Sequence, residues 1–382
     1  MITLLQIKNF KAHASTELGL SSINILTGLN GIGKSSALQS ILLLRQSYMK
    51  NLLSKGLDLN GDLCSVGTAK DAIFISAETD EIEFEIKQKN KEDIKLVFGV
   101  NRNRIIDTFL RRTSVSNLPI PDSSVFNNNF QYISAFRNGP VSIYEKDTAI
   151  VEIFKQMSRR EGRCELVAHY LYHFKEENVS DKSMTKVKDK VKDDDPTLKF
   201  QVMEWMREIS PDIGNIHIEE VAEAGYKVEY SFSRGEGETV TNRFKAMDVG
   251  FGISYVLPII VAALHTRKDG LVLVENPESH IHPAGQAKLM ELICKSAKAG
   301  VQFIIETHSD HIINGLLVAT KKGIIDPEDS RVYYFDRKVS THATQVIHLP
   351  VLTGGKIRKP PKGFFDQIAK DMTTLMGLKE WG

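Results

Sequence analysis

The 382-residue sequence has few cysteines and lacks the marks of a secreted or membrane-spanning protein. Its three cysteines, Cys64, Cys164 and Cys294, lie far apart and show no metal-binding spacing, which favours a reducing, cytoplasmic environment. No apolar run reaches 18 residues, so we expect no membrane partner. The first residues predict a strand rather than a signal peptide, and neither repeats nor sustained heptads are present.

Strong charge of one sign is also absent, because the net charge is only +1. No global electrostatic field therefore attracts the chain to nucleic acid or to a membrane, although a local basic patch stays possible. The hydrophobic content of 42% and charged content of 25% are those of an ordinary globular protein. The length allows two or three domains.

The most informative segment runs from Gly28 to Ser35 and fits the pattern G-x-x-x-x-G-K-[ST]. Residues 23–26 predict a short buried strand before it, and residues 36–44 predict a helix after it. The glycines let backbone N–H groups surround phosphate oxygens, and the helix N-terminus adds partial positive charge. We expect Lys34 to reach the β- and γ-phosphates of ATP and Ser35 to ligate Mg²⁺. The alternative is a glycine turn that only caps a helix.

Two later strand ends supply candidate catalytic groups. Leu271–Val274 is a short apolar run that ends in Glu275, the position from which a phosphate-loop ATPase holds Mg²⁺. The apolar run 303–305 is followed by His308, which would lie at the carboxyl edge of the sheet, where ligands bind in α/β folds. A neutral imidazole there would contact the γ-phosphate or the attacking water. The alternatives are a solvated turn at Glu275 and a surface-loop histidine.

A third candidate is the segment 248–254, which precedes an apolar helical run over 255–264. Gly250, Gly252 and Ser254 at a helix start form a second anion site, which would serve the nucleotide of a partner subunit in a dimer. A flexible glycine entry to a capped helix is the alternative. The full set of predicted nucleotide-binding residues is Asn30, Gly31, Gly33, Lys34, Ser35, Ser36, Gly250, Gly252 and Ser254.

The pattern along the chain predicts an α/β fold in which one nucleotide-binding sheet is assembled from both ends of the sequence. Residues 1–140 would contain the phosphate loop and an antiparallel β subdomain with alternating strands at 82–86 and 94–98. Residues 141–245 would form an inserted helical and β lobe. Residues 246–382 would complete the head with buried parallel strands. The nearly neutral charged run 175–195 predicts a solvated helix or loop rather than a binding tail.

Four motifs in this order resemble the ABC-type AAA ATPases of bacteria. They are GLNGIGKSS, DVGFGIS, LVLVENPESHIHP and IIETHSDHI. The opening ITLLQIKNFKAHASTEL and the tail GFFDQIAKDM match as well, so the resemblance covers nearly the whole chain. The most similar group is the short relatives of overcoming-lysogenization-defect proteins and of RecF and SMC heads, which often belong to anti-phage defence operons. The resemblance implies a P-loop NTPase head of the ABC type.

The resemblance also implies residue roles. Glu275 matches the Mg²⁺ carboxylate, His308 the switch histidine, and DVGFGIS the signature segment that closes on ATP in trans. His280, His282 and Pro283 match a turn at the dimer seam. Arg137 lies in a block frequent in the group and is either a structural ion pair or an interface residue.

One departure concerns the position after Glu275. Most ABC ATPases have a glutamate there that orients the attacking water, whereas this chain has Asn276. An amide accepts no proton at neutral pH, so general-base assistance would be lost at this position. Either Glu278 substitutes and hydrolysis is slow, or ATP acts mainly as a dimer clamp. Related members share an amide here, so the chain is not expected to be a dead enzyme.

A second departure is that the larger relatives carry a Toprim nuclease domain after the head, which we do not expect here. Nuclease or toxin activity would then come from a separate effector protein. The first functional hypothesis is a homodimeric or higher homo-oligomeric ATPase that regulates this effector in bacterial defence. The second is a DNA-binding ATPase of repair or recombination, and a transporter motor is disfavoured. A small basic cluster would touch DNA phosphates or an acidic partner, or else be a solvated loop; it comprises Lys356, Arg358, Lys359 and Lys362.

Overall fold

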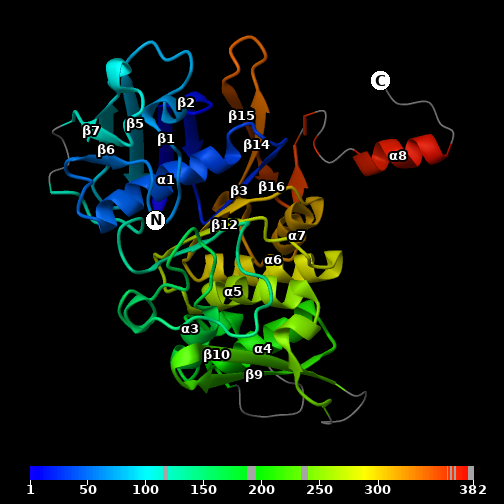
Figure 1. Cartoon of the computed structure of the whole chain (residues 1–382). Coiled ribbons are helices and arrows are strands. Elements are labelled where there is room, and N and C mark those ends of the chain that lie inside the picture. Colours follow the sequence, from blue (N-terminus) through cyan, green and yellow to red (C-terminus); the bar gives the residue numbers. More distant parts are fainter. Residues whose placement is uncertain are drawn as a thin grey trace.

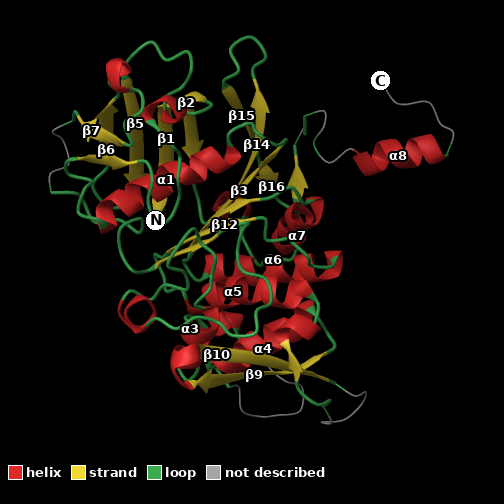
Figure 2. Cartoon of the chain, in the orientation of Figure 1, coloured by secondary structure: helices red, strands yellow, loops and turns green. Residues whose placement is uncertain are grey.

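The computed structural model describes residues 1–114, 119–186, 195–233, 240–358, 360–361, 364 and 367–376. Within them the chain builds two six-stranded sheets, a three-stranded sheet, a two-stranded sheet and layers of helices (Figure 1). Figure 2 shows the β-rich upper part and the helices below the central sheet. The mixed α/β class predicted from the sequence is confirmed.

The central sheet carries the candidate site and has the strand order β15–β14–β3–β13–β12–β8. Strands β14, β3, β13, β12 and β8 are parallel to their neighbours, and β15 is antiparallel at one edge. Its strands are β15 (Thr344–Leu349), β14 (Ser330–Arg337), β3 (Ile23–Gly28), β13 (Gln302–Glu306), β12 (Leu271–Glu275) and β8 (Phe130–Ile133). Strands from both ends of the chain therefore lie side by side, as the sequence predicted.

The second sheet is antiparallel and lies beside helix α1 (Lys34–Met49). In order it contains β2 (His13–Gly19), β1 (Ile2–Phe10), β5 (Glu81–Gln88), β6 (Ile94–Gly99), β7 (Phe109–Arg112) and β4 (Gly56–Asp58). The burial of alternate residues along β5 and β6 confirms the predicted hairpin with one solvated face. The short helix α2 (Ala69–Ala72) begins with a capping box.

Helices α5 (Phe251–His265) and α6 (Pro283–Lys298) pack against the central sheet, and α7 (Asp310–Lys321) packs against α6. Helices α3 (Val167–Phe174) and α4 (Leu198–Ile209) form a further layer below α5 and α6. Below α4 lies the three-stranded sheet of β9 (Ile213–Val221), β10 (Gly225–Phe232) and β11 (Phe244–Lys245). The boundaries predicted for the inserted lobe stay a prediction, but its helices share one hydrophobic cluster with the central sheet.

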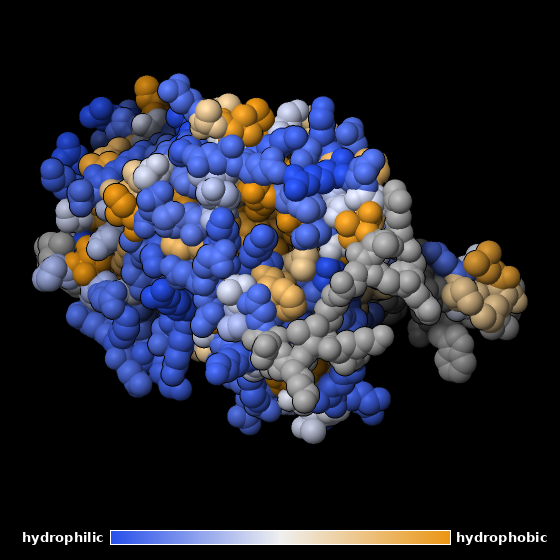
Figure 3. All heavy atoms as spheres, turned by 90° about the horizontal axis from the view of Figure 1, so that it is seen from below, coloured by the Kyte–Doolittle hydropathy of each residue, from blue (hydrophilic) through white to orange (hydrophobic). Residues whose placement is uncertain are grey.

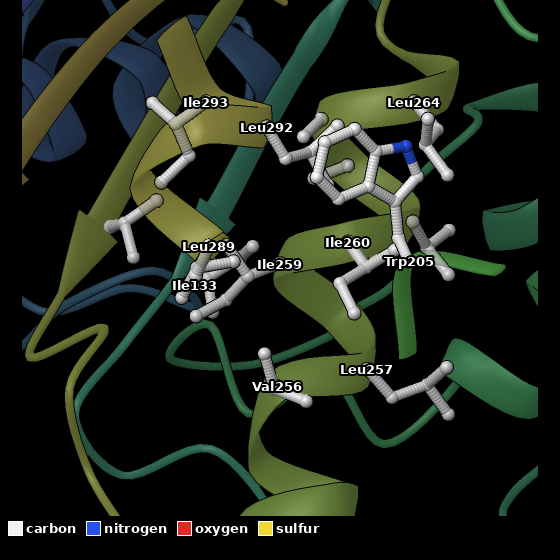
Figure 4. Close-up of a cluster of buried hydrophobic side chains, with 14 of the residues drawn as sticks. Ile133, Trp205, Val256, Leu257, Ile259, Ile260, Leu264, Leu289, Leu292 and Ile293 are labelled. Atoms are coloured by element: carbon white, nitrogen blue, oxygen red, sulfur yellow. The ribbon is translucent and has the colours of Figure 1, made fainter. Parts of the chain in front are cut away.

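Figure 4 shows how this cluster joins the lobe to the head. Trp205 of α4 is fully buried against side chains of α5 and α6, and its indole N–H donates a 2.8 Å hydrogen bond to Met184 O. Ile133 at the end of β8 contributes from the sheet side. Replacing a buried tryptophan of this kind by alanine costs about 3–5 kcal/mol. The lobe is thus packed firmly onto the helices that lead to the site.

The C-terminal part of the chain ends in β16 (Val351–Leu352), β17 (Lys356–Ile357) and α8 (Gln367–Leu375). Helix α8 projects from the body (Figure 1). Its residue Leu375 is exposed. The face in Figure 3 is otherwise mostly hydrophilic with small apolar patches. Of the predicted basic cluster, Lys356 and Arg358 are described, whereas Lys359 and Lys362 lie outside the described residues, as do residues 187–194 of the charged run. In the described part of the chain, no helix is long and apolar enough to cross a bilayer.

Candidate functional site

The phosphate loop connects β3 to α1, and its lysine lies over the loop's own carbonyl groups. Lys34 is the first residue of α1, is buried, and donates from Nζ to Gly28 O at 3.0 Å and to Leu29 O at 2.6 Å. Burial lowers the pKa of Lys34, and the negative charge of Glu306 opposes this shift. The ammonium group is therefore held at the loop, where phosphate oxygens would replace two weak carbonyl partners.

The loop is fixed from two sides by other parts of the fold. Gly33 has φ 105°, and a Cβ there would lie 2.4 Å from Oγ1 of Thr344 on β15. Thr344 Oγ1 donates to Ile32 O at 2.9 Å, and Nε2 of the fully buried His13 lies 2.9 Å from Gly33 O. Burial lowers the pKa of His13 to about 4, so its ring is neutral at physiological pH. Only glycine fits this left-handed, crowded position.

Ser35, the predicted Mg²⁺ ligand, contacts Glu306, a carboxylate that the sequence analysis did not assign to the site. Its Oγ donates a 2.8 Å hydrogen bond to Oε1 of Glu306 at the end of β13. Glu275, at the end of β12, instead accepts from the Tyr132 hydroxyl and the Ala135 N–H, each at 3.1 Å. The role predicted for Glu275 stays a prediction. The structure adds Glu306 as a second carboxylate, one strand nearer the phosphate loop.

The pKa values of both carboxyl groups, Glu306 and Glu275, are raised. Burial, together with the charge of Glu275, raises the pKa of Glu306 to about 7, and the Ser35 bond and Lys34 only partly oppose this. Burial also raises the pKa of Glu275, while the Ala135 N–H and Tyr132 hydroxyl lower it. Two buried carboxyl groups on adjacent strands repel each other until a cation or a proton is present.

Glu278 holds the loop that carries His308. Its Oε2 accepts from the Thr307 hydroxyl at 2.8 Å, and its Oε1 accepts from the His308 backbone N–H at 2.9 Å. Partial burial and the Lys34 ammonium lower the pKa of His308, so the imidazole is neutral near pH 7. The sequence placed both residues at the site, and the structure brings them into direct contact. It also gives Glu278 a positioning contact that the sequence did not indicate.

Asn276 occupies the position after Glu275 in a left-handed conformation with φ 44°. Its N–H donates to Glu306 O at 2.8 Å, which extends the pairing of β12 and β13 by one residue. Asparagine tolerates such positive φ values better than most residues. Asn276 lines the cleft together with Ser35 and His308.

The predicted signature segment forms the start of α5. Gly250 is exposed, and a Cβ there would meet nothing within 4 Å. Gly252 lies against the turn after β12, because a Cβ there would be 2.3 Å from His280 O. Ser254 is buried inside the chain, so this side chain is not displayed to a partner in this structure. His282 instead caps α6, accepting from the Ala284 N–H at 3.3 Å.

Arg137 forms no ion pair among the described residues, and its side chain is buried within the subunit rather than displayed at the surface. It is 1% exposed, and its hydrogen bonds in the described part of the chain all go to carbonyl oxygens. The guanidinium donates to Tyr255 O in α5 and, at the β8 and β12 strand ends, to Ser134 O, Glu275 O and Asn276 O, at 2.8–3.1 Å. It therefore ties the signature helix to the end of β12.

These groups line an open cleft of about 400 Å³ at the carboxyl edge of the central sheet. Ser35, Glu275, Glu306 and His308 all face it. No cluster of three or more His, Cys, Asp or Glu side chains able to hold a metal alone is found in the described residues. The oxygens that the cleft does offer are the Ser35 hydroxyl and the carboxylates of Glu275 and Glu306. Mg²⁺ typically takes one or two carboxylates and completes its shell with phosphate oxygens and water.

Three site residues escaped the sequence analysis. Glu306 carried a usable signal, since it ends a buried strand at the same edge as His308. Thr344 and Arg337, whose guanidinium donates to Gly31 O, carried none, because a hairpin far along the chain brings them to the loop.

The fold, together with the family that the sequence matches, indicates a phosphate-loop ATPase. The sequence of residues 23–314 matches the family described as AAA domain, putative AbiEii toxin, Type IV TA system, and the chain belongs to this family. Residues 325–375 match a second family, described as a protein of unknown function (DUF3696). No curated protein is a significant match.

Solved structures support the fold. An SMC head bound to the C-winged helix domain of ScpA has a TM-score of 0.51 at 14% identity, with 92% of this chain and 98% of that chain covered. An SMC head with an extended coiled coil, bound to the C-terminal domain of ScpA from Pyrococcus furiosus, has a TM-score of 0.50 at 14% identity, with 98% of both chains covered. At this identity the likeness concerns the fold alone.

Proposed function

We propose that the chain binds ATP with Mg²⁺, closes around it as a homodimer or higher homo-oligomer, and hydrolyses it slowly to regulate an effector. The observation that carries this proposal is that Ser35, Glu275 and His308 line one cleft at the edge of the sheet. Lys34, the residue before Ser35, is held at the phosphate loop by the carbonyls of Gly28 and Leu29. The effector would be a separate nuclease or toxin protein in bacterial anti-phage defence, acting in the cytoplasm.

The contacts of each residue suggest a separate role for it in binding ATP and Mg²⁺. Lys34 would exchange its two carbonyl partners for β- and γ-phosphate oxygens, and the backbone N–H groups of the loop would surround the same oxygens. The Ser35 hydroxyl, with a carboxylate at this edge of the sheet such as Glu275, would hold Mg²⁺, which neutralises charge on the β- and γ-phosphates. Neutral His308, positioned by Glu278, would face the γ-phosphate.

Slow turnover follows from the missing glutamate. Asn276 accepts no proton at neutral pH, so positioning and electrostatics must carry most of the catalysis. Glu278 is the residue that we propose to assist the attacking water. Its carboxylate already holds the His308 loop, so assistance requires one oxygen to exchange a loop contact for the water.

The exposed start of α5 supports assembly in trans. Gly250 is open to solvent, and Met247, Phe251 and Phe136 around the same region are large, exposed apolar side chains. A second subunit's nucleotide would approach the backbone N–H groups at this helix start. Arg137 would then transmit closure from α5 to the β12 end, where Glu275 lies.

A pull-down tests the proposal. ATP affinity, oligomeric state and co-purification of the product of a neighbouring gene are compared between wild type and Lys34→Ala. Loss of the charged contacts to phosphate is expected to lower ATP affinity by about 10- to 100-fold and to abolish ATP-dependent association. Lys50→Ala, which removes an ion pair with Asp58 away from the site, is the control. Unchanged ATP affinity and oligomeric state in Lys34→Ala would overturn the proposal.

The alternative function is binding of duplex DNA in repair or recombination, as the SMC-head fold and exposed Lys356 allow. DNA binding would show a steep salt dependence, reduced when Lys356 and Arg358 are neutralised. DNA binding of that kind, without a co-purifying effector, would favour this alternative.

A further inference from the structure

Glu306 is the carboxylate bonded to the phosphate-loop serine, and only one of its two oxygens has a hydrogen-bond partner among the described residues. Glu306 is 6% exposed, and its Oε1 accepts the hydrogen bond from Ser35 Oγ. Its Oε2 is buried and has no hydrogen-bond partner among the described residues. Burying a carboxylate oxygen without a hydrogen-bond partner lowers the stability of the fold. A ligand that binds this oxygen would remove that cost.

Both oxygens of the neighbouring carboxylate, Glu275, accept hydrogen bonds. Glu275 lies in register with Glu306 across β12 and β13. Tyr132 holds Oε1 and the Ala135 N–H holds Oε2. These partners hold Glu275 toward β8, whereas Glu306 is held toward the loop by Ser35.

The Ser35–Glu306 bond also sets the direction of the hydroxyl. A serine hydroxyl has one proton and two lone pairs, and here the proton points to Oε1. The lone pairs are therefore left for a cation in the cleft that both residues line. Oxygen donors from a hydroxyl and a carboxylate are those that Mg²⁺ prefers.

We infer that Glu306 is a carboxylate of the Mg²⁺ site, which orients Ser35 through Oε1 and offers Oε2 to the cation or to a water of its shell. The inference rests on the proposed function, since it assumes that ATP binds with Mg²⁺. It assigns the contact with the phosphate-loop serine to the end of β13, and leaves Glu275 to support the shell from the next strand.

The test separates metal binding from nucleotide binding. The affinity for a non-hydrolysable ATP analogue is measured in EDTA and again with Mg²⁺, and the ratio gives the gain due to the metal. Mn²⁺ binding to the same complex is followed by electron paramagnetic resonance. Glu306→Gln is expected to keep the affinity in EDTA but to lose about 10- to 100-fold of the gain and of the Mn²⁺ affinity.

Two variants provide the comparison. Glu165→Gln removes a carboxylate that is equally buried but bonded to Ser158 and Arg159 outside the cleft, and should keep the full gain. Glu275→Gln should lose less of the gain than Glu306→Gln. If Glu306→Gln does not fold, Glu306→Asp, which retains the charge on a shorter side chain, is used instead, and a reduced gain supports the inference.

The outcomes are distinguishable. A full gain in the folded Glu306 variant, or loss confined to Glu275→Gln, would overturn the inference while leaving ATP binding intact. A wild-type protein that binds no ATP analogue in either condition would refute the proposed function itself.

Discussion

Gly252 in α5 and His280 in the turn after β12 touch through their backbones. A Cβ on Gly252 would lie 2.3 Å from the His280 carbonyl oxygen, closer than real Cβ atoms come to any atom. The obstacle is backbone, so no side-chain rotation relieves it. Helix α5 and the turn after β12 are therefore in direct contact within one subunit.

Two glycine substitutions separate this internal contact from the proposed contact between subunits. Gly252→Ala is expected to lower the melting temperature because α5 must move away from the turn. Gly250→Ala should leave the monomer's stability within about 0.5 kcal/mol, since the added methyl meets no atom. It should nevertheless weaken ATP-dependent association, measured by light scattering. Normal association in Gly250→Ala would argue against a nucleotide contact at this position.

The Arg137 guanidinium gives a second prediction. Arg137→Lys places one ammonium where a fork of donors reaches carbonyls of α5 and β12, so several carbonyls lose their partner. We expect a loss of unfolding free energy on the order of 3 kcal/mol in urea titrations. We also expect ATP-dependent association to become weaker.

Arg45→Lys is the matched control for Arg137. Arg45 is equally buried and donates to the carbonyls of Val125 and Asn127, away from the cleft. It should lose comparable stability but keep ATP-dependent association. Equal loss of association in both variants would mean that Arg137 acts only through stability.

The raised pKa of Glu306 predicts a pH-dependent stability without metal. The pKa rises to about 7 in the folded chain, above its value of 4.5 in the unfolded chain, so the folded state binds more protons between these values. The stability contributed by this group is therefore lost as pH rises from about 4.5 to 7. In EDTA, Glu306→Gln should be more stable than wild type at pH 8, by up to about 3 kcal/mol, and equally stable near pH 4.5.

Thermal melts at both pH values check this, with Glu165→Gln as comparison. Glu165 accepts hydrogen bonds from the Ser158 hydroxyl and the Arg159 N–H, so its replacement should destabilise rather than stabilise. A Glu306→Gln protein that is less stable than wild type at pH 8 would contradict the prediction.

Glu278 provides the prediction on turnover. Glu278→Gln is expected to lower steady-state ATP hydrolysis by about 10-fold or more, since it removes the proposed base and weakens the hold on His308. ATP affinity should change little, because Glu278 contacts the switch loop rather than the phosphate loop. Unchanged hydrolysis would refute the role of Glu278, and rapid wild-type turnover would exclude a pure ATP clamp.

Much of the fold was readable from local pattern. The strand before Gly28, the helix after Lys34 and the apolar strand ending at Glu275 were predicted and lie where expected. The helix begins earlier and runs further than predicted, from Lys34 to Met49, because tertiary packing buries its later turns.

The roles of individual site residues were harder to predict from the sequence than the fold. Arg137 carried a charge that suggested an ion pair, yet its partners are carbonyls, which every residue possesses and no sequence pattern marks. Glu306 was visible as a strand-end carboxylate, but nothing local distinguished it from Glu275. The hairpin residue Thr344 gave no signal at all.

The sequence by itself determined the phosphate loop, the parallel strands and the residue types at their ends, because these depend on spacing and on alternation within short segments. The tertiary structure decided which carboxylate meets Ser35. The sheet places β13 between β3 and β12, so a residue 271 positions away becomes the neighbour of Ser35. Strand order is set by packing of the whole sheet against its helices, and local sequence does not encode it.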